Sequence, residues 1–129
     1  MQITGTAVSL TVDDVRASSD FLTSHLGFAE EMSADGFASL RRNDSQMSVV
    51  LLRRGIDVLP DNLRDQHAAG VIVAFVVTDL DAEEARLRSE GVPITMPLHE
   101  EPWGERLFLV TDPNGVVYEL AEWAVPAGQ

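Results

Sequence analysis

The stretch EPWGERLFLVTDPNGVVYELAEW, residues 101–123, is the most informative part of the chain. Two largely apolar runs within it, 106–111 and 116–123, predict strands. Asp112-Pro113-Asn114-Gly115 lies between the runs and predicts a tight turn, because proline fixes one backbone angle and glycine tolerates turn conformations. The stretch therefore predicts an antiparallel hairpin near the end of the sequence.

The segments before this hairpin predict a βαβββ pattern that occurs twice. In the second half, a strand at 71–77, a helix at 79–90 and a strand at 94–96 precede the hairpin. The first half has the same order, with a strand at 7–12, a helix to about residue 25, and strands at 28–32, 37–41 and 47–52. The connector 53–70 predicts a loop with a helical turn near 62–67. The unbroken apolar run 71–77 predicts a strand buried on both faces.

An internal repeat supports one pseudo-symmetric domain. Val12-Asp13-Asp14-Val15 recurs as Val77-Thr78-Asp79-Leu80. Each half alone is too small to bury a sufficient core. We therefore predict a single α+β domain over 1–129, with internal repeats at about 3–55 and 68–125. The alternative is a chance echo inside a ferredoxin-like α+β sandwich.

Polar residues mark where each predicted helix begins. Asp13 and Asp14 offer side-chain oxygens that can cap the first helix. In the second helix, Asp81 and Glu84 have the spacing of a capping box. Glu84 and Arg88 have the i,i+4 spacing of a helical ion pair.

The composition argues against several classes of partner. The 129 residues include 21 carboxylates and 9 basic side chains, all of them arginine, for a net charge of −12. Such a chain repels phosphate backbones and anionic lipids, so we expect neither nucleic acid nor membrane as a partner. The absence of cysteine excludes disulfides and thiolate chemistry. No targeting or membrane-spanning segment is recognisable, and we expect a cytoplasmic protein.

Two stretches, FLTSHLGF at 21–28 and the segment 101–123, resemble the glyoxalase / bleomycin-resistance / extradiol-dioxygenase superfamily, also called vicinal oxygen chelate. The resemblance covers essentially the whole chain and agrees with the doubled βαβββ pattern. It implies that the paired modules form a curled sheet around a cup-shaped cavity. It also implies a homodimer.

Superfamily enzymes typically hold a divalent metal at four equivalent strand positions inside the cup. The resemblance places these positions at Ala7, Leu51, Val73 and Glu119. One carboxylate among three hydrocarbon side chains cannot replace the water shell of an ion, so the chain resembles a non-metal member without cofactor or catalytic residues. We interpret His25, His67 and His99 as ordinary surface residues. The alternative is a metal-dependent lyase, isomerase or dioxygenase with relocated ligands.

The segment EPWGERLF at 101–108, and the spacing from LGF to DGF at 26–37, are similar to the non-metal branch that binds bleomycin-type drugs. In that branch, aromatic residues at the positions of Phe37 and Trp103 stack on the flat tail of the drug from opposite subunits. Stacking and cation–π attraction give a physical basis for such binding. Carboxylates that suit a cation flank both aromatic residues: Asp35, Glu100, Glu101 and Glu105.

Each of these residues also has a purely structural interpretation. Trp103 could be a core residue, Phe37 a plain strand residue, and the carboxylates near Trp103 a solvated loop face. Glu119 is expected to point into an apolar cup, where it either pairs with an arginine such as Arg106 or meets a ligand. The candidate ligand-binding residues are therefore Phe37, Trp103, Glu119 and Arg106.

The predicted function is metal-independent binding of a small, planar or cationic molecule of drug or antibiotic type. Resistance by sequestration is one use of such binding. An enzyme of the same superfamily is the main alternative, and a partner-binding domain that reuses the cup is a third. The ligand itself is not encoded in any recognisable motif.

Overall fold

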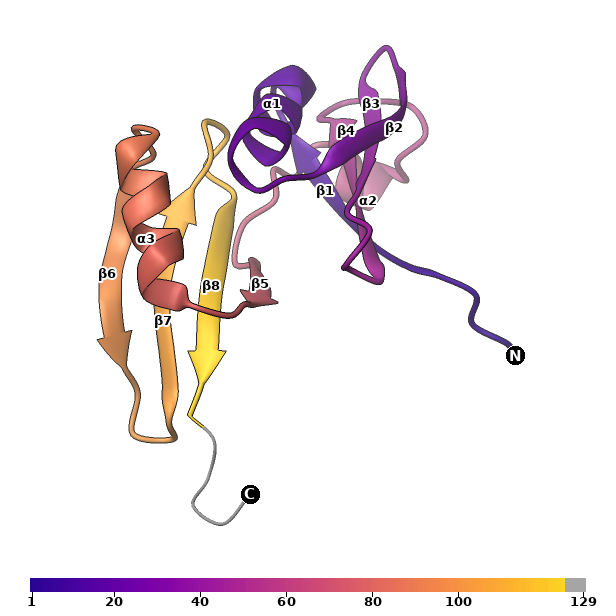
Figure 1. Cartoon of the computed structure of the whole chain (residues 1–129). Coiled ribbons are helices and arrows are strands. Elements are labelled where there is room, and N and C mark those ends of the chain that lie inside the picture. The colour runs from indigo at the N-terminus through magenta and orange to yellow at the C-terminus, as the bar shows by residue number, and fades with distance from the viewer. Residues whose placement is uncertain (125–129) are drawn as a thin grey trace. The chain divides into compact units, whose positions relative to one another are not determined.

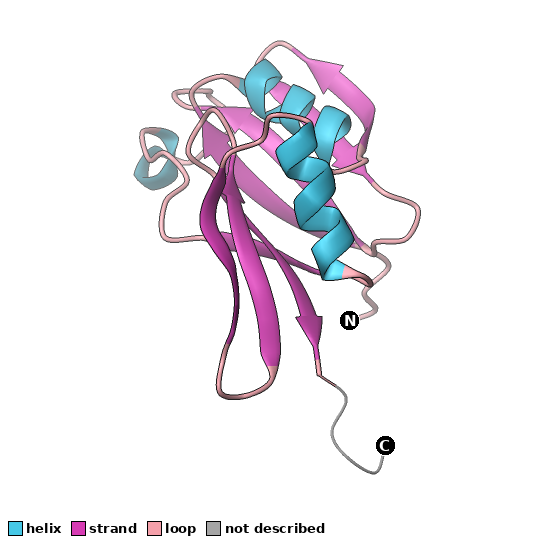
Figure 2. Ribbon diagram, turned by 60° about the vertical axis from the view of Figure 1, so that its left-hand side comes forward, coloured by secondary structure: helices cyan, strands magenta, loops and turns pink. Residues whose placement is uncertain are grey.

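The computed structural model describes residues 1–124 of the chain (Figure 1). The chain divides into two compact units, Met1–Ala69 and Gly70–Gln129. The predicted end of the second repeat, at residue 125, lies outside the described residues. Each unit contains a four-stranded sheet and one main helix. Figure 2 colours the helices and strands of the chain.

The first unit forms a mixed sheet in the strand order β1-β4-β3-β2. Strand β1 runs parallel to β4, and the β3–β4 and β2–β3 pairs are antiparallel. Its elements are β1 (Thr6–Val12), α1 (Val15–His25), β2 (Ala29–Ala34), β3 (Phe37–Arg41), β4 (Met47–Arg53) and the short α2 (Asp61–Arg64).

The second unit repeats this topology in the order β5-β8-β7-β6. Strand β5 is parallel to β8, and the remaining pairs are antiparallel. Its elements are β5 (Ile72–Val76), α3 (Leu80–Ser89), β6 (Ile94–Glu100), β7 (Glu105–Thr111) and β8 (Val117–Trp123). The doubled βαβββ pattern and the α+β class predicted from the sequence are confirmed.

The hairpin predicted in residues 101–123 forms through a buried carboxylate in its turn. Asp112 is buried, and its side chain accepts hydrogen bonds from the amides of Asn114 (2.9 Å) and Val116 (3.0 Å). The Tyr118 hydroxyl donates a third bond to it at 3.3 Å. Burial and the Asp112 charge raise the pKa of Tyr118, so this phenol stays protonated.

The first helix begins as the sequence predicts. The Asp14 side chain accepts a hydrogen bond from the Ala17 amide at 3.1 Å, which satisfies one free donor at the start of α1. Arg16, in the first turn of α1, pairs with Glu30 of β2 at 2.8 Å, and the Ser19 hydroxyl donates to the same carboxylate at 2.6 Å. These contacts tie α1 to the edge of its sheet.

Three local predictions for the second unit are wrong. The predicted capping box of Asp81 and Glu84 is absent, because Asp81 bonds Arg106 and the Glu84 side chain accepts a bond from the Leu98 amide at 3.2 Å. The N-cap residue is Asp79, whose φ of 55° lies in the left-handed region. The predicted Glu84–Arg88 pair does form, at 3.6 Å.

The other two errors concern strands at the edges of this sheet. Strand β5 is not buried on both faces: Ile72 is 54% exposed and Val76 is 69% exposed. Its continuous apolar run therefore corresponds to one buried face and one apolar face that is exposed to solvent. Strand β6 extends to Glu100 rather than ending at residue 96, which places His99 on a strand and not in a loop.

Each helix covers one face of its own sheet. Figure 1 shows α3 lying over the second sheet. Arg106 of β7 bonds Asp81 of α3, so α3 covers the face that carries Arg106 and its partner Glu122. Side chains of that face are buried together with Leu80 and Leu87 of α3: Val73, Phe108, Val110, Tyr118 and Leu120. In the first unit the buried residues include Leu10, Val12, Leu22, Leu40, Val49 and Leu51. Within residues 1–124, no helix has the length and apolar character needed to cross a membrane.

Candidate functional site

The candidate site lies on the face of the second sheet opposite α3, which we call the open face. Strand alternation assigns its residues, because side chains two apart share a face. The register pairs Glu119 of β8 with Ala74 of β5 and with Leu109 of β7. Farther along the face, Glu105 stands opposite Trp123. The open face is defined by Ala74, Glu105, Leu109, Glu119 and Trp123.

Trp103 lies in the turn between β6 and β7, at one end of this face. It is 63% exposed, so the interpretation of Trp103 as a core residue is wrong. Gly104, with φ of +91°, gives the turn a backbone conformation that other residues rarely adopt. The indole Nε1 of Trp103 donates a hydrogen bond to Glu105 Oε1 at 3.1 Å.

Glu119 belongs to the same group of side chains. Its carboxyl lies within hydrogen-bonding reach of the Glu105 carboxyl. Burial, together with this neighbouring acid, raises the pKa of Glu119 above its ordinary value of 4.5. The open face and the turn at its end thus hold three polar groups close together: the Trp103 indole and the carboxyl groups of Glu105 and Glu119.

Arg106 does not join this group. It lies on the α3 side of β7, where its guanidinium pairs with Asp81 at 3.1 Å and with Glu122 at 3.3 Å. The pairing of Glu119 with Arg106 considered from the sequence is therefore wrong. The physical reason is strand alternation: neighbouring residues on a strand point to opposite faces, and Glu105, not Arg106, shares the face of Glu119.

The register also corrects two of the four positions carried over by resemblance. Leu51 and Val73 are buried on the helix-covered faces, next to Leu10 and Tyr118 respectively. A displacement of one residue moves a strand position to the other face of the sheet. The residue paired with Glu119 on β5 is Ala74. In the first unit, the matching pair is Val50 of β4 with Ser9 of β1. Ala7 lies on the open side of β1, as expected.

His99 forms an acid–base pair beside this group. Its Nε2 lies 2.7 Å from Glu101 Oε1, and the hydrogen bond to Glu101 raises the pKa of the imidazole. The partner of His99 on β7 is Leu107. Within residues 1–124, no three histidine or carboxylate side chains gather closely enough to hold a metal ion.

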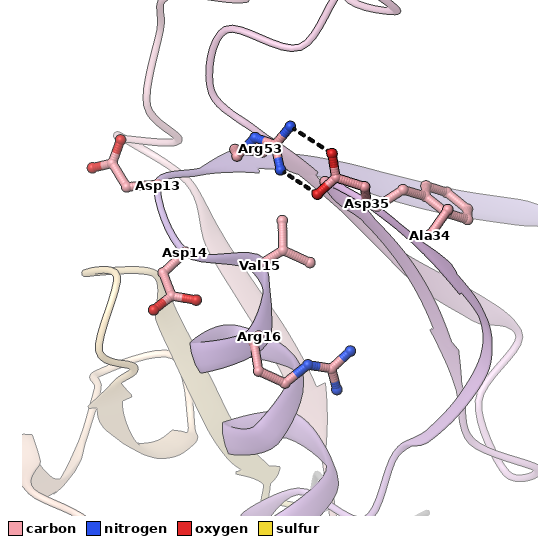
Figure 3. A pocket seen from close by; sticks show the side chains of 9 residues that line it. Asp13, Asp14, Val15, Arg16, Ala34, Asp35 and Arg53 are labelled. Carbon is pink, nitrogen blue, oxygen red and sulfur yellow. Dashed lines mark hydrogen bonds and ion pairs between the residues drawn. The ribbon is translucent and has the colours of Figure 1, made fainter.

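The first unit contains a separate cavity of about 430 Å³ between the start of α1 and the β2–β3 turn. Phe37, Asp13 and Arg53 are among its lining residues. Figure 3 shows Arg53 reaching Asp35 through two contacts, of 2.9 and 3.2 Å. The carboxylate predicted to attract a cation near Phe37 is therefore already paired. Phe37 itself is half-buried and stands opposite Leu52 of β4.

The structure thus brings together two of the four candidate residues, Trp103 and Glu119, through Glu105. Arg106 faces the other side of the sheet, and Phe37 belongs to the first unit. The sequence placed Glu105 in an acidic cluster but did not identify its contacts. The available signal was the order Trp-Gly-Glu, in which a glycine turn brings the carboxylate back toward the indole.

Comparisons with known proteins agree with this architecture. A glyoxalase / bleomycin-resistance / dioxygenase protein from Nocardioides is 25% identical, with 100% of this chain and 90% of that chain covered and a TM-score of 0.77. TnmS3, described as an antibiotic binding protein from Streptomyces sp. CB03234, is 24% identical over 96% and 99% of the two chains, with a TM-score of 0.74. A lactoylglutathione lyase from Agrobacterium tumefaciens is 18% identical over 91% of each chain, with a TM-score of 0.70. The last two similarities show a shared fold and nothing about activity.

No curated protein sequence matched the chain. The family profile described as the Glyoxalase/Bleomycin resistance protein/Dioxygenase superfamily matches residues 5–120, which include every strand but the last residues of β8. This match spans both βαβββ units and agrees with their strand order. The chain therefore belongs to the glyoxalase/bleomycin resistance protein/dioxygenase superfamily.

Proposed function

We propose that the chain is a metal-independent protein that binds small, planar, cationic molecules, with antibiotic-like compounds among its ligands. The observation that carries the proposal is the exposed Trp103 on the open face, bonded to Glu105 and followed by Glu119. An indole face stacks on flat rings and attracts cations, and each such contact contributes about 0.5–2 kcal/mol. The acidic sequence adds long-range attraction for a cation.

The positions of the acidic groups favour binding over metal chemistry. The residue paired with Glu119 on β5 is Ala74, the matching pair in the first unit is Val50 with Ser9, and Ala7 lies two residues before Ser9 on the same face. None of these four side chains is an imidazole or carboxylate of the kind that metal sites require. The similarity to TnmS3 is consistent with the proposal, although that similarity is one of fold.

A cationic acridine tests the proposal directly. The probe is 10-methylacridinium, whose charge does not depend on pH, and acridone serves as its neutral, planar counterpart. Trp123→Phe leaves Trp103 as the single tryptophan. We expect saturable quenching of Trp103 by the cation and weaker quenching by acridone. In Trp103→Leu, where the fluorescence of the probe itself reports binding, we expect binding of the cation to be lost. Equal binding of both probes, or unchanged binding in Trp103→Leu, contradicts the proposal.

Metal content separates the proposal from the enzymatic alternative. We expect elemental analysis of the purified protein to find divalent metal well below one equivalent, and binding of 10-methylacridinium to persist after treatment with a chelator. Stoichiometric metal that is lost in Glu119→Ala would favour a lyase, isomerase or dioxygenase with relocated ligands. We also propose a homodimer, which analytical ultracentrifugation of the full chain tests.

A further inference from the structure

We propose that Glu105 determines the cation selectivity of the Trp103 site, by holding the indole in a fixed orientation and placing a negative charge at its edge. The inference rests on the proposed function, because it concerns the same ligand. It assigns to Glu105 the role of a positioning residue for Trp103 and of a direct electrostatic contact for the ligand.

The backbone on both sides of Trp103 is already fixed. The Glu101 amide donates to the Glu105 carbonyl at 2.7 Å, and the Gly104 amide donates to the Glu101 carbonyl at 3.0 Å. The Ala124 amide, just after β8, donates to the Gly104 carbonyl at 2.8 Å. The freedom that remains in this turn is therefore that of the Trp103 side chain, which is mostly exposed.

The Glu105 carboxylate limits that freedom. Its Oε1 accepts the indole N–H of Trp103 at 3.1 Å, and hydrogen bonds to a charged acceptor are about twice as strong as neutral ones. Ordering a side chain when a ligand binds costs about 0.5–1.5 kcal/mol. A tryptophan that is already held in place avoids part of this cost. The indole therefore presents a ready surface to a flat molecule.

The charge of Glu105 is placed differently from that of its neighbours. Glu101 contacts His99 at 2.7 Å, and Glu122 contacts Arg106 at 3.3 Å. Both of those carboxylates have a basic partner. Glu105 helps to raise the pKa of His99 through its charge, but the groups that its carboxyl bonds are an indole and the carboxyl of Glu119. Its charge at the edge of the ring attracts a cation that lies over the ring, and contributes little to the binding of a neutral ring.

Two substitutions separate position from charge. Glu105→Gln keeps an oxygen that can accept the indole N–H but removes the charge, whereas Glu105→Ala removes both. Both are made in the Trp123→Phe protein, so that one indole is observed. Glu90→Gln is the matched control. It removes one carboxylate directly after α3, the helix on the other face of the sheet, where Glu90 pairs with Arg86 at 3.0 Å.

The first measurement needs no ligand. In Glu105→Ala we expect the indole N–H resonance of Trp103 to shift upfield and its fluorescence anisotropy to fall. In Glu105→Gln we expect both signals to stay close to the parent values, and Glu90→Gln should match the parent. An unchanged indole resonance in Glu105→Ala overturns the positioning role.

The second measurement compares the two probes. In Glu105→Gln we expect the affinity for 10-methylacridinium to fall about fivefold, while the affinity for acridone changes less than about twofold. In Glu105→Ala we expect both affinities to fall. Equal losses of both probes in Glu105→Gln, or no loss of the cation, overturn the selectivity role. If the parent protein binds neither probe, the proposed function fails, and the indole measurement still decides the positioning role.

Discussion

The two units have the same strand order but carry different residues on the faces that their helices leave uncovered. Each unit joins its helix to its sheet through an ion pair, Arg16 with Glu30 in the first and Arg106 with Asp81 in the second. In the first unit, the matching centre of the open side carries Ser9, Ser39 and Val50. In the second unit, the open face carries carboxyl groups beside an exposed tryptophan.

This difference shows that the βαβββ topology alone does not place the site. In each sheet the last strand, β4 or β8, lies between a parallel and an antiparallel neighbour. Val50 of β4 and Glu119 of β8 occupy equivalent positions in this arrangement. What differs are the side chains at the matching positions and the content of one turn. If the first unit is mainly a scaffold and the second mainly a recognition surface, substitutions in the two units should have different effects.

The largest effect is expected in the turn between β7 and β8. Asp112→Ala removes three hydrogen bonds at a buried position and leaves the Tyr118 hydroxyl without its acceptor. We expect a loss of about 2–4 kcal/mol in the free energy of unfolding, measured by denaturant titration. Asp44→Ala, in the corresponding turn of the first unit, removes only an exposed pair with Arg42 and should cost far less. Equal losses would break the comparison.

The next effect concerns the ion pair that holds α1. Bonds from Arg16 and Ser19 lower the pKa of Glu30 from 4.5 to about 2. The folded state therefore releases this proton more readily than the unfolded state, and the gain in stability is present above pH 4.5 and is lost as the pH falls toward 2. We expect Glu30→Gln to cost about 1–2 kcal/mol at pH 7, allowing for partial exposure.

The measurement for Glu30 is a pair of unfolding curves at each pH. The difference between the parent and Glu30→Gln should shrink steadily as the pH falls below the ordinary range of a glutamate. A difference that is the same at acidic and neutral pH would show that Glu30 does not hold α1 through its charge.

Glu119 should show the opposite pH dependence. Its pKa is raised, so the folded state holds the proton more tightly than the unfolded state does. Stability from this group is therefore complete at low pH and falls as the pH rises from 4.5 through the folded pKa. We expect Glu119→Gln to become more stable relative to the parent over this pH window. Thermal unfolding across the window measures the trend, and a flat difference would contradict a raised pKa of Glu119.

The smallest expected effect is that of a substitution in the first unit on ligand affinity. If Phe37 adds a second stacking surface, Phe37→Leu should weaken binding of 10-methylacridinium about threefold to fivefold. Trp103→Leu should weaken it by tenfold or more, because it removes both the stacking surface and its attraction for the cation. A larger loss for Phe37→Leu than for Trp103→Leu would move the main recognition surface to the first unit.

Much of the fold follows from the sequence because strand alternation, helix caps and turn residues are local signals. The strand at 37–41 was predicted with the bounds that β3 has, and Asp14 caps α1 as expected. The errors arise where a local pattern does not determine the environment. A continuous apolar run does not reveal whether one or two faces of β5 are covered. Asp81 is drawn away from its predicted cap by Arg106, a partner 25 residues later.

The site was predicted less completely, for two physical reasons. Trp103 and Glu119 could be named from the resemblance, but the face of a strand residue depends on register, and an error of one residue misplaced Leu51 and Val73. The bond between Trp103 and Glu105 depends on the turn at Gly104, whose geometry only the folded hairpin defines. Glu105 was therefore visible as an acid but not as a partner.

All three groups of the candidate site come from one uninterrupted piece of chain, the turn before β7 and the β7–β8 hairpin. Because the βαβββ module occurs twice, the chain contains two such hairpins. Residues on the uncovered face of one hairpin can therefore differ from those of the other while both sheets keep the same strand order. Val50 and Glu119 show the result: two modules share one backbone plan, and the second carries a carboxyl group where the first carries a hydrocarbon side chain.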